Sequence, residues 1–138
     1  MKKNDCYTIR KFDTPIDFST EIKADNIEII YCNTFEIGQG GPVVGNISIN
    51  GNFIPQHYFG GPVLLDKKNV YIPIYMKKMF FWRFKLARIN LGSFKIDTIR
   101  KWESVIFLDK IENGIVFFYK EVSKTHSNYY KLSDFNTK

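Results

Sequence analysis

Short apolar runs separated by turn residues follow one another along the whole chain, a pattern typical of an antiparallel β protein. These runs predict about nine to eleven strands. They cover Tyr7–Phe12, Asn26–Cys32, Val44–Ile49, Asn52–Tyr58, Val63–Asp66, Val70–Tyr75, Phe80–Leu91, Phe94–Ile99, Val105–Leu108, Ile115–Tyr119 and Tyr129–Leu132. Only Asp13–Lys23 indicates a helical turn, with Asp13 or Thr14 as its cap and Pro15 at its first position.

Turn residues and side-chain alternation refine this assignment. Asn50-Gly51 and Asn113-Gly114 predict tight hairpins, because Asn and Gly accept the positive φ values of such turns. Pro73 lacks an amide donor, so we expect its strand to lie at a sheet edge or to carry a bulge there. In Phe80–Leu91 the apolar positions change parity, which predicts a β-bulge or a bend near Leu86-Ala87.

Two later strands are apolar at every position. Val105–Leu108 and Ile115–Tyr119 are continuous apolar runs, as expected for strands that are covered on both faces. This interpretation places Phe107 and Phe117 in the core.

A weak internal repeat bears on the architecture. Residues 63–75 and 106–119 resemble each other at a spacing of 43 residues, which marks either a repeated unit or two hairpins of similar composition. Asp66 and Asp109 occupy matching positions, which we interpret as turns where Asp bonds the backbone. We expect one all-β domain over residues 1–138, built of antiparallel meanders stacked as an open propeller-like array or a β-sandwich.

Composition supports this fold class, and the charge is unevenly distributed. The chain has 18 Ile, 13 Phe and 8 Tyr but only 2 Ala, which excludes a mostly helical fold and excludes disorder. The net charge is +6, and the excess lies after residue 69, where 13 Lys and Arg face 6 Asp and Glu. The densest block, Lys77–Lys101, has eight basic residues and one acid. Such a block suits nucleic acid, an anionic membrane surface or an acidic protein, or it is a solvated face.

Targeting and metal binding leave few signals. No apolar segment follows the basic residues of Met1–Asp5, so we expect a cytoplasmic protein with no membrane partner. Cys6 and Cys32 are the only cysteines; one disulfide is possible, although a reducing cytosol favours free thiols. Because the chain has two Cys and two His without paired spacing, we expect no metal and no cofactor.

The chain contains no catalytic motif that we can identify. Gly38–Pro42 and Gly60–Pro62 are Gly-rich, but neither leads into a phosphate-binding helix, so both are interpreted as turns. His57 and His126, with Lys124 close to the second, would suit acid–base cleavage of RNA. Nothing in the sequence brings the two histidines together, and we therefore expect no enzymatic activity.

The segment Met76–Arg88 interleaves aromatic and basic residues. Alternation places Arg83 and Lys85 on the face opposite Trp82 and Phe84. Cations that neutralise phosphates and aromatics that stack on bases would suit RNA, but stacking requires the aromatics to share the basic face. The pattern therefore favours a half-buried strand whose aromatic face packs into the core and whose cations remain available for an acidic partner.

A small, motif-poor, β-rich chain with many Ile, Lys and Asn residues resembles the immunity proteins of bacterial contact-dependent growth inhibition, a polymorphic-toxin system. The general character of the whole chain carries this resemblance, and Phe59–Asp66 with Tyr71–Tyr75 match most closely. The resemblance implies a non-enzymatic inhibitor that binds the C-terminal toxin domain of a large cell-surface protein, often a nuclease that acts on tRNA. One departure is the charge, since inhibitors of basic nucleases are often acidic and this chain is basic.

Two sets of residues are candidates for the contact with a toxin domain. The basic set is Lys77, Lys78, Arg83, Lys85 and Arg88, and the acidic set is Glu21, Asp25, Glu28 and Glu36. The alternative function is an RNA-binding β domain that uses the basic segment 77–101, and a ribonuclease based on the two histidines is a third class.

Overall fold

The computed structural model describes residues 13–135; the predicted strand Tyr7–Phe12 and the residue Cys6 lie outside them. Within the described residues the chain forms eleven strands, one short 3₁₀ turn and no α-helix, which confirms the predicted all-β class. The strands are β1 (Glu21–Ala24), β2 (Ile27–Glu36), β3 (Val43–Ile49), β4 (Asn52–Phe59), β5 (Leu64–Leu65), β6 (Asn69–Lys78), β7 (Phe81–Asn90), β8 (Ile96–Thr98), β9 (Phe107–Glu112), β10 (Ile115–Tyr119) and β11 (Ser127–Lys131), and the 3₁₀ turn covers Leu132–Asp134.

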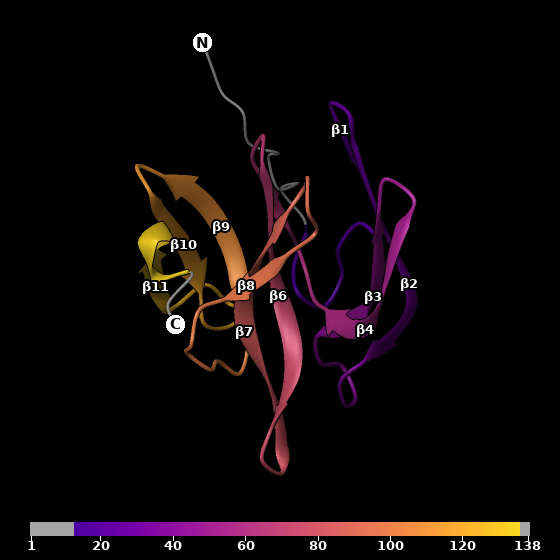
Figure 1. Cartoon of the computed structure of the whole chain (residues 1–138). Coiled ribbons are helices and arrows are strands. Elements are labelled where there is room, and N and C mark those ends of the chain that lie inside the picture. The colour runs from indigo at the N-terminus through magenta and orange to yellow at the C-terminus, as the bar shows by residue number, and fades with distance from the viewer. Residues whose placement is uncertain (1–12, 136–138) are drawn as a thin grey trace.

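Two antiparallel sheets make up the fold (Figure 1). The larger sheet has the strand order β1-β2-β3-β4-β6-β7-β8, with the short β5 paired beside β6, and it curls into a half-barrel. The smaller sheet has the order β11-β10-β9. Most neighbours within a sheet are also neighbours along the chain, which confirms the predicted antiparallel meanders. Asn50-Gly51 and Asn113-Gly114 form two of the connecting turns with positive φ values, as predicted.

The β6–β7 hairpin lies between two hydrophobic cores. Its strands pair over ten residues, from Asn69 opposite Asn90 to Lys78 opposite Phe81. The half-barrel core, enclosed by the larger sheet, takes alternate side chains of the hairpin, namely Val70, Ile72, Ile74, Ala87 and Ile89. The inter-sheet core takes the intervening side chains Tyr71, Phe84 and Leu86, which pack with residues of the smaller sheet. The hairpin is therefore covered on both faces along its inner half.

The predicted β-bulge at Leu86-Ala87 is wrong, because the register between β6 and β7 runs without a shift. Leu86 packs into the inter-sheet core and Ala87 into the half-barrel core, and both are fully buried. A change of apolar parity in a strand that is covered on both faces therefore does not require a bulge.

Pro73 lies in an interior strand, so the predicted position at a sheet edge is wrong. Strand β6 has β7 on one side and β4 and β5 on the other. The carbonyl of Pro73 accepts a hydrogen bond of 2.9 Å from the N–H of Gly60. Because the N–H and C=O of one strand residue point to the same neighbour, the missing amide faces the gap between β4 and β5. An interruption in the partner strand accommodates this proline.

The predicted helical turn at Asp13–Lys23 is also wrong. The Thr14 hydroxyl accepts hydrogen bonds of 3.2 Å from the backbone N–H groups of Ile16 and Asp17, as a cap would, but the chain then extends into β1. Ile22 of β1 is buried in the half-barrel core. Burial of this side chain outweighs the local helix signal.

The two halves of the predicted repeat form the hairpins β5–β6 and β9–β10, which belong to different sheets. Asp66 caps a turn, since its Oδ1 accepts hydrogen bonds of 2.9 and 2.8 Å from the N–H groups of Lys68 and Asn69. Asp109 does not lie in a turn. It lies within β9 at a shift of register between Leu108 and Lys110, which is a β-bulge.

The predicted burial on both faces is confirmed for the first of the two apolar runs, where Ile106, Phe107 and Leu108 are all buried, but it is wrong for β10. In β10, Val116 and Phe118 are buried in the inter-sheet core, whereas Phe117 lies half-buried on the outer face. Phe107 of β9 is buried as predicted, but Phe117 is not a core residue. Although every residue of β10 is apolar, only one face of this strand is buried.

Two substitutions on adjacent residues separate these faces. We expect Phe118→Ala to lower the free energy of unfolding by about 3–5 kcal/mol, because it leaves a cavity beside Tyr130, whose ring centre lies 4.8 Å away. Phe117→Ala should cost far less, because that ring already contacts solvent. Urea denaturation of both variants measures the difference; equal losses would contradict the one-sided burial of β10.

Candidate binding surface

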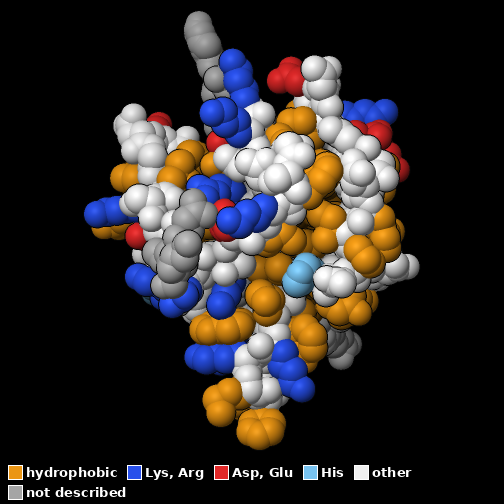
Figure 2. Space-filling view, in the orientation of Figure 1, with side chains coloured by type: hydrophobic (Ala, Val, Ile, Leu, Met, Phe, Trp, Pro, Cys, Tyr) orange, Lys and Arg blue, Asp and Glu red, His pale blue; other side chains and the backbone are white. Residues whose placement is uncertain are grey.

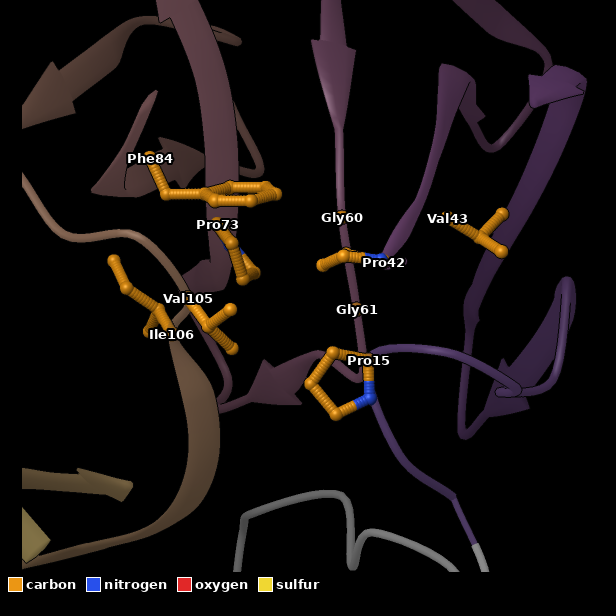
Figure 3. A pocket seen from close by; sticks show the side chains of 9 residues that line it. All are labelled: Pro15, Pro42, Val43, Gly60, Gly61, Pro73, Phe84, Val105 and Ile106. Atoms are coloured by element: carbon orange, nitrogen blue, oxygen red, sulfur yellow. The ribbon is translucent and has the colours of Figure 1, made fainter. Parts of the chain in front are cut away.

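The seam between the two sheets is packed closed. Figure 3 shows the ring of Phe84 and three prolines beside the backbone of Gly60 and Gly61. The space among these lining residues is too small for a water molecule. Glycine is required at position 61, because a Cβ there would lie 2.7 Å from the ring of Phe18. The predicted turn at Gly60–Pro62 thus has a packing role, and the space beside it is too small for a ligand.

The structure does not bring the two histidines together. His57 lies in β4 with its ring centre 6.1 Å from that of Phe59, and its carbonyl accepts a 2.9 Å hydrogen bond from the buried side chain of Asn46. His126 lies before β11 in the smaller sheet, with Nδ1 2.7 Å from the carboxylate of Glu121. The two histidines that a ribonuclease would need therefore lie at different sheets, His57 within the larger one and His126 next to the smaller one.

Glu121 organises the loop that carries His126. Its carboxylate accepts hydrogen bonds from the backbone N–H groups of Thr125 and His126, at 2.9 and 2.7 Å, in addition to the contact with the imidazole. Slight desolvation would raise the pKa of Glu121, but these hydrogen bonds outweigh it and lower the pKa below its ordinary value. The contact between Glu121 and His126 is therefore explained by the structure of this loop, without a catalytic role.

Metal ligation has no candidate in the described part of the chain. Among residues 13–135, no group of three or more His, Cys, Asp or Glu side chains is placed to hold an ion. Cys32 of β2 is a partly buried free thiol.

A continuous row of aromatic rings crosses the larger sheet. We call Phe35, Tyr58, Tyr75 and Trp82, from four different strands, the aromatic ridge. The ring centres of Phe35 and Tyr58 lie 5.1 Å apart, those of Tyr58 and Trp82 6.5 Å, and those of Trp82 and Tyr75 5.3 Å. Tyr75 also contacts the buried ring of Phe84 at 5.0 Å, which anchors the row to the inter-sheet core.

Strand register explains how these rings meet. Tyr58 pairs with Tyr75, Tyr75 pairs with Phe84, and Lys77 pairs with Trp82, so the side chains share the outer face of the sheet. The smaller sheet covers that face over Phe84 but leaves the ridge exposed to solvent. Partial burial raises the pKa of Tyr75 above its ordinary value.

A shallow groove of about 260 Å³ runs beside the ridge. Its lining includes Ile37, Pro42, Tyr75, Trp82, Phe84 and Ser104. The predicted Gly-rich turn before β3 forms part of this wall, because Pro42 accepts a 2.8 Å backbone hydrogen bond from Ile37 across it. The groove is open and mostly apolar, which suits a protruding side chain of a partner protein rather than an enclosed substrate.

Three of the five predicted basic residues lie exposed on the outer part of the β6–β7 hairpin, where Arg83 also lines the groove. They are Lys77, Lys78 and Arg83. Arg83 Nη1 donates a 2.9 Å hydrogen bond to the Ser104 hydroxyl, and the Lys78 ammonium lies 5.7 Å from the ring centre of Trp102. These contacts are at the surface, so all three charges remain available to a partner.

The other two basic candidates are used within the fold. The Arg88 guanidinium lies 3.2 Å from the Asp97 carboxylate, and both side chains are mostly buried. The Lys85 ammonium lies 4.4 Å from the ring centre of Trp102. Burial lowers the pKa of Lys85, and the nearby charge of Arg100 lowers it further. Neither residue is well placed for a partner.

The acidic candidates do not form one patch. Glu21, Asp25 and Glu28 lie on the β1–β2 hairpin, where Glu28 forms an ion pair of 3.6 Å with Lys23. Glu36 lies at the opposite end of β2, beyond the bulge in its pairing with β3. The acidic set is therefore divided between two ends of a ten-residue strand.

The sequence interpretation missed the end of the β6–β7 hairpin. Met79, Phe80 and Phe81, which we call the tip, have exposed fractions of 78%, 86% and 67%. Met79 also adopts a left-handed conformation with φ of 55°, which favours Gly or Asn over a bulky side chain. A local signal was present, because Met-Phe stands where two other tight hairpins, at residues 50–51 and 113–114, carry Asn-Gly.

Comparison of the chain with protein-family models, with curated proteins and with solved structures finds no match. Within residues 13–135, no helix is long and apolar enough to cross a membrane. The candidate sites for function are therefore the exposed surfaces of the described residues.

The backbone of the tip gives a stability prediction. At an ordinary strand position Gly is less stabilising than Ala, but at the left-handed position 79 the order should reverse. We expect Met79→Gly to raise the free energy of unfolding by about 1 kcal/mol relative to Met79→Ala. Thermal and urea denaturation of the two variants measure this, and a less stable glycine variant would contradict the strain at the tip.

Proposed function

We propose that this chain is a non-enzymatic protein-binding module, an immunity protein that neutralises a toxin domain of a contact-dependent inhibition system. The aromatic ridge is the observation that supports binding of a protein. Four partly exposed rings with a basic rim, next to an open apolar groove, match the composition of protein-binding hot spots.

The physical case rests on rigidity as well as on composition. Each ring of the ridge is held by the next ring at 5–7 Å and the row ends on the buried Phe84, so little side-chain entropy is lost when a partner covers it. Binding would remove these rings from water without first reorganising the surface. The ridge is accordingly a preformed interface.

The resemblance to immunity proteins suggests that the partner is a toxin domain. The basic residues beside the ridge indicate which kind of toxin surface would be contacted. Lys77 and Arg83 border the ridge, so a complementary toxin surface would be acidic there. A nuclease cleft that holds RNA is basic and would repel this rim. The proposal therefore places the contact on an acidic surface of the toxin, outside a phosphate-binding cleft.

The proposal predicts that a large exported protein is encoded directly upstream of this chain, and the test uses the C-terminal domain of that protein. Co-expression of the chain should restore growth of cells that express the domain, and the two proteins should co-purify. Absence of protection and of binding would contradict the proposal. Tight tRNA binding by the chain alone, with a steep dependence on salt, would instead favour the alternative of an RNA-binding domain that uses the basic segment 77–101.

A matched pair of variants locates the interface. Phe35 on the ridge is 43% exposed and Phe53, away from it on β4, is 51% exposed. We expect Phe35→Ser to raise the Kd for the toxin domain about 30-fold, which corresponds to about 2 kcal/mol, and Phe53→Ser to leave it unchanged. Binding kinetics measure both. Equal effects of the two variants would exclude the ridge as the interface.

A further inference from the structure

The outer part of the β6–β7 hairpin extends beyond the rest of the molecule. Past Tyr75 and Phe84, the two strands pair only with each other within the described residues. Figure 1 shows this hairpin projecting from the lower end of the fold, and Figure 2 shows hydrophobic and basic side chains gathered there. We call residues 76–83 the arm; its tip is Met79, Phe80 and Phe81. Phe81 also lines the groove of the proposed toxin contact, which leaves Met79 and Phe80 unused.

The side chains near the end of the arm point to both of its faces. Phe81 pairs with Lys78 and Trp82 pairs with Lys77, so the two aromatic rings lie on opposite sides of the hairpin. Met79 and Phe80 form the turn itself. A flat protein surface would cover only one side of such an arm. A medium that surrounds the end of the hairpin would remove all of these groups from water.

A collar of positive charge follows directly behind the tip. Lys77, Lys78 and Arg83 lie within two positions of the tip residues, about 7 Å along the strands. Residues 67–96 contain no Asp or Glu, so the collar has no acid on its own hairpin to neutralise it. An amphipathic membrane anchor buries its apolar part about 5–10 Å into the interface, with cations at the level of the headgroups.

We propose that the tip inserts into the surface of a bilayer with anionic headgroups, while the collar residues contact those headgroups. Trp82 lies at the boundary between tip and collar, where an indole ring prefers the interface. The site anchors the protein to one leaflet and does not span the membrane. The sequence led us to expect no membrane partner, because the separation of tip and collar becomes visible only in the hairpin. The inference does not depend on the proposed toxin contact.

The test is binding of the whole chain to vesicles. One set contains only phosphatidylcholine, and the other contains about one third phosphatidylglycerol. We expect the protein to sediment with the anionic vesicles and to bind the neutral vesicles about tenfold more weakly. No sedimentation with anionic vesicles, or equal binding to both sets, would overturn the proposal.

The two tryptophans report where insertion takes place. The Trp102→Phe variant retains Trp82 at the tip boundary, whereas Trp82→Phe retains Trp102, which contacts Lys85. Because the ring centre of Trp102 lies 5.7 Å from the collar ammonium of Lys78, anionic vesicles should shift the emission of the first variant to shorter wavelength by clearly more than that of the second. Because Trp102 takes part in packing, the circular dichroism of both variants must match that of the wild type, and sedimentation of the wild type provides an independent readout. A shift in the second variant only would overturn the assignment to the tip.

Matched variants separate insertion from adsorption by charge. Phe80→Ser with Phe81→Ser should weaken binding to the anionic vesicles about tenfold or more, while Phe53→Ser on β4 should not. Unchanged binding of the tip variant would show charge adsorption alone and overturn insertion. A different result would be that the wild type self-associates without binding vesicles and that the tip variant does not self-associate. That result would show that a second copy of the chain covers the tip, and it would also overturn insertion into a bilayer. Because no toxin is present, these results do not depend on the outcome of the toxin assay.

Discussion

Burial of the β6–β7 hairpin on both faces is the interaction on which the rest of the structure depends. Its inner half contributes Ile72 and Ile89 to the core of the half-barrel, and Tyr71 and Leu86 to the core between the sheets. Each sheet buries its own apolar side against a different face of this one hairpin. Neither core would be complete without it, and a change in its register would exchange the two faces and disrupt both cores at once.

The functional surfaces are the parts of this hairpin and its sheet that the two cores leave uncovered. The smaller sheet has only three strands and covers the outer face over Phe84, but not over the rings beyond it. The aromatic ridge continues from the inter-sheet core into solvent. Its rings are exposed, but they are held in place because the row packs against the buried ring of Phe84. The arm is likewise uncovered, because the β6–β7 hairpin extends along its own axis beyond the strands that pack against it.

The sequence was sufficient for features that depend on local chemistry. The two Asn-Gly turns predicted the hairpins β3–β4 and β9–β10, and the aromatic and Ile-rich composition predicted the class. Double-sided burial could not be separated from a bulge at Leu86-Ala87, since both give the same apolar pattern. The ridge joins Phe35 to Trp82 across four strands, and the ion pair of Arg88 with Asp97 needs the β7–β8 pairing. Such contacts follow only from the topology.

The turn at the tip is fixed by the register on either side of it, so its sequence is free of the demands of the core. Ten consecutive pairs from Asn69 opposite Asn90 to Lys78 opposite Phe81 leave two residues to close the hairpin, whatever those residues are. Folding alone would favour Asn and Gly there, as at residues 50–51 and 113–114, and solubility would favour polar groups. Met79 and Phe80 satisfy neither preference. Their apolar character therefore requires an explanation outside the fold, and a surface that removes them from water is the one that chemistry supplies.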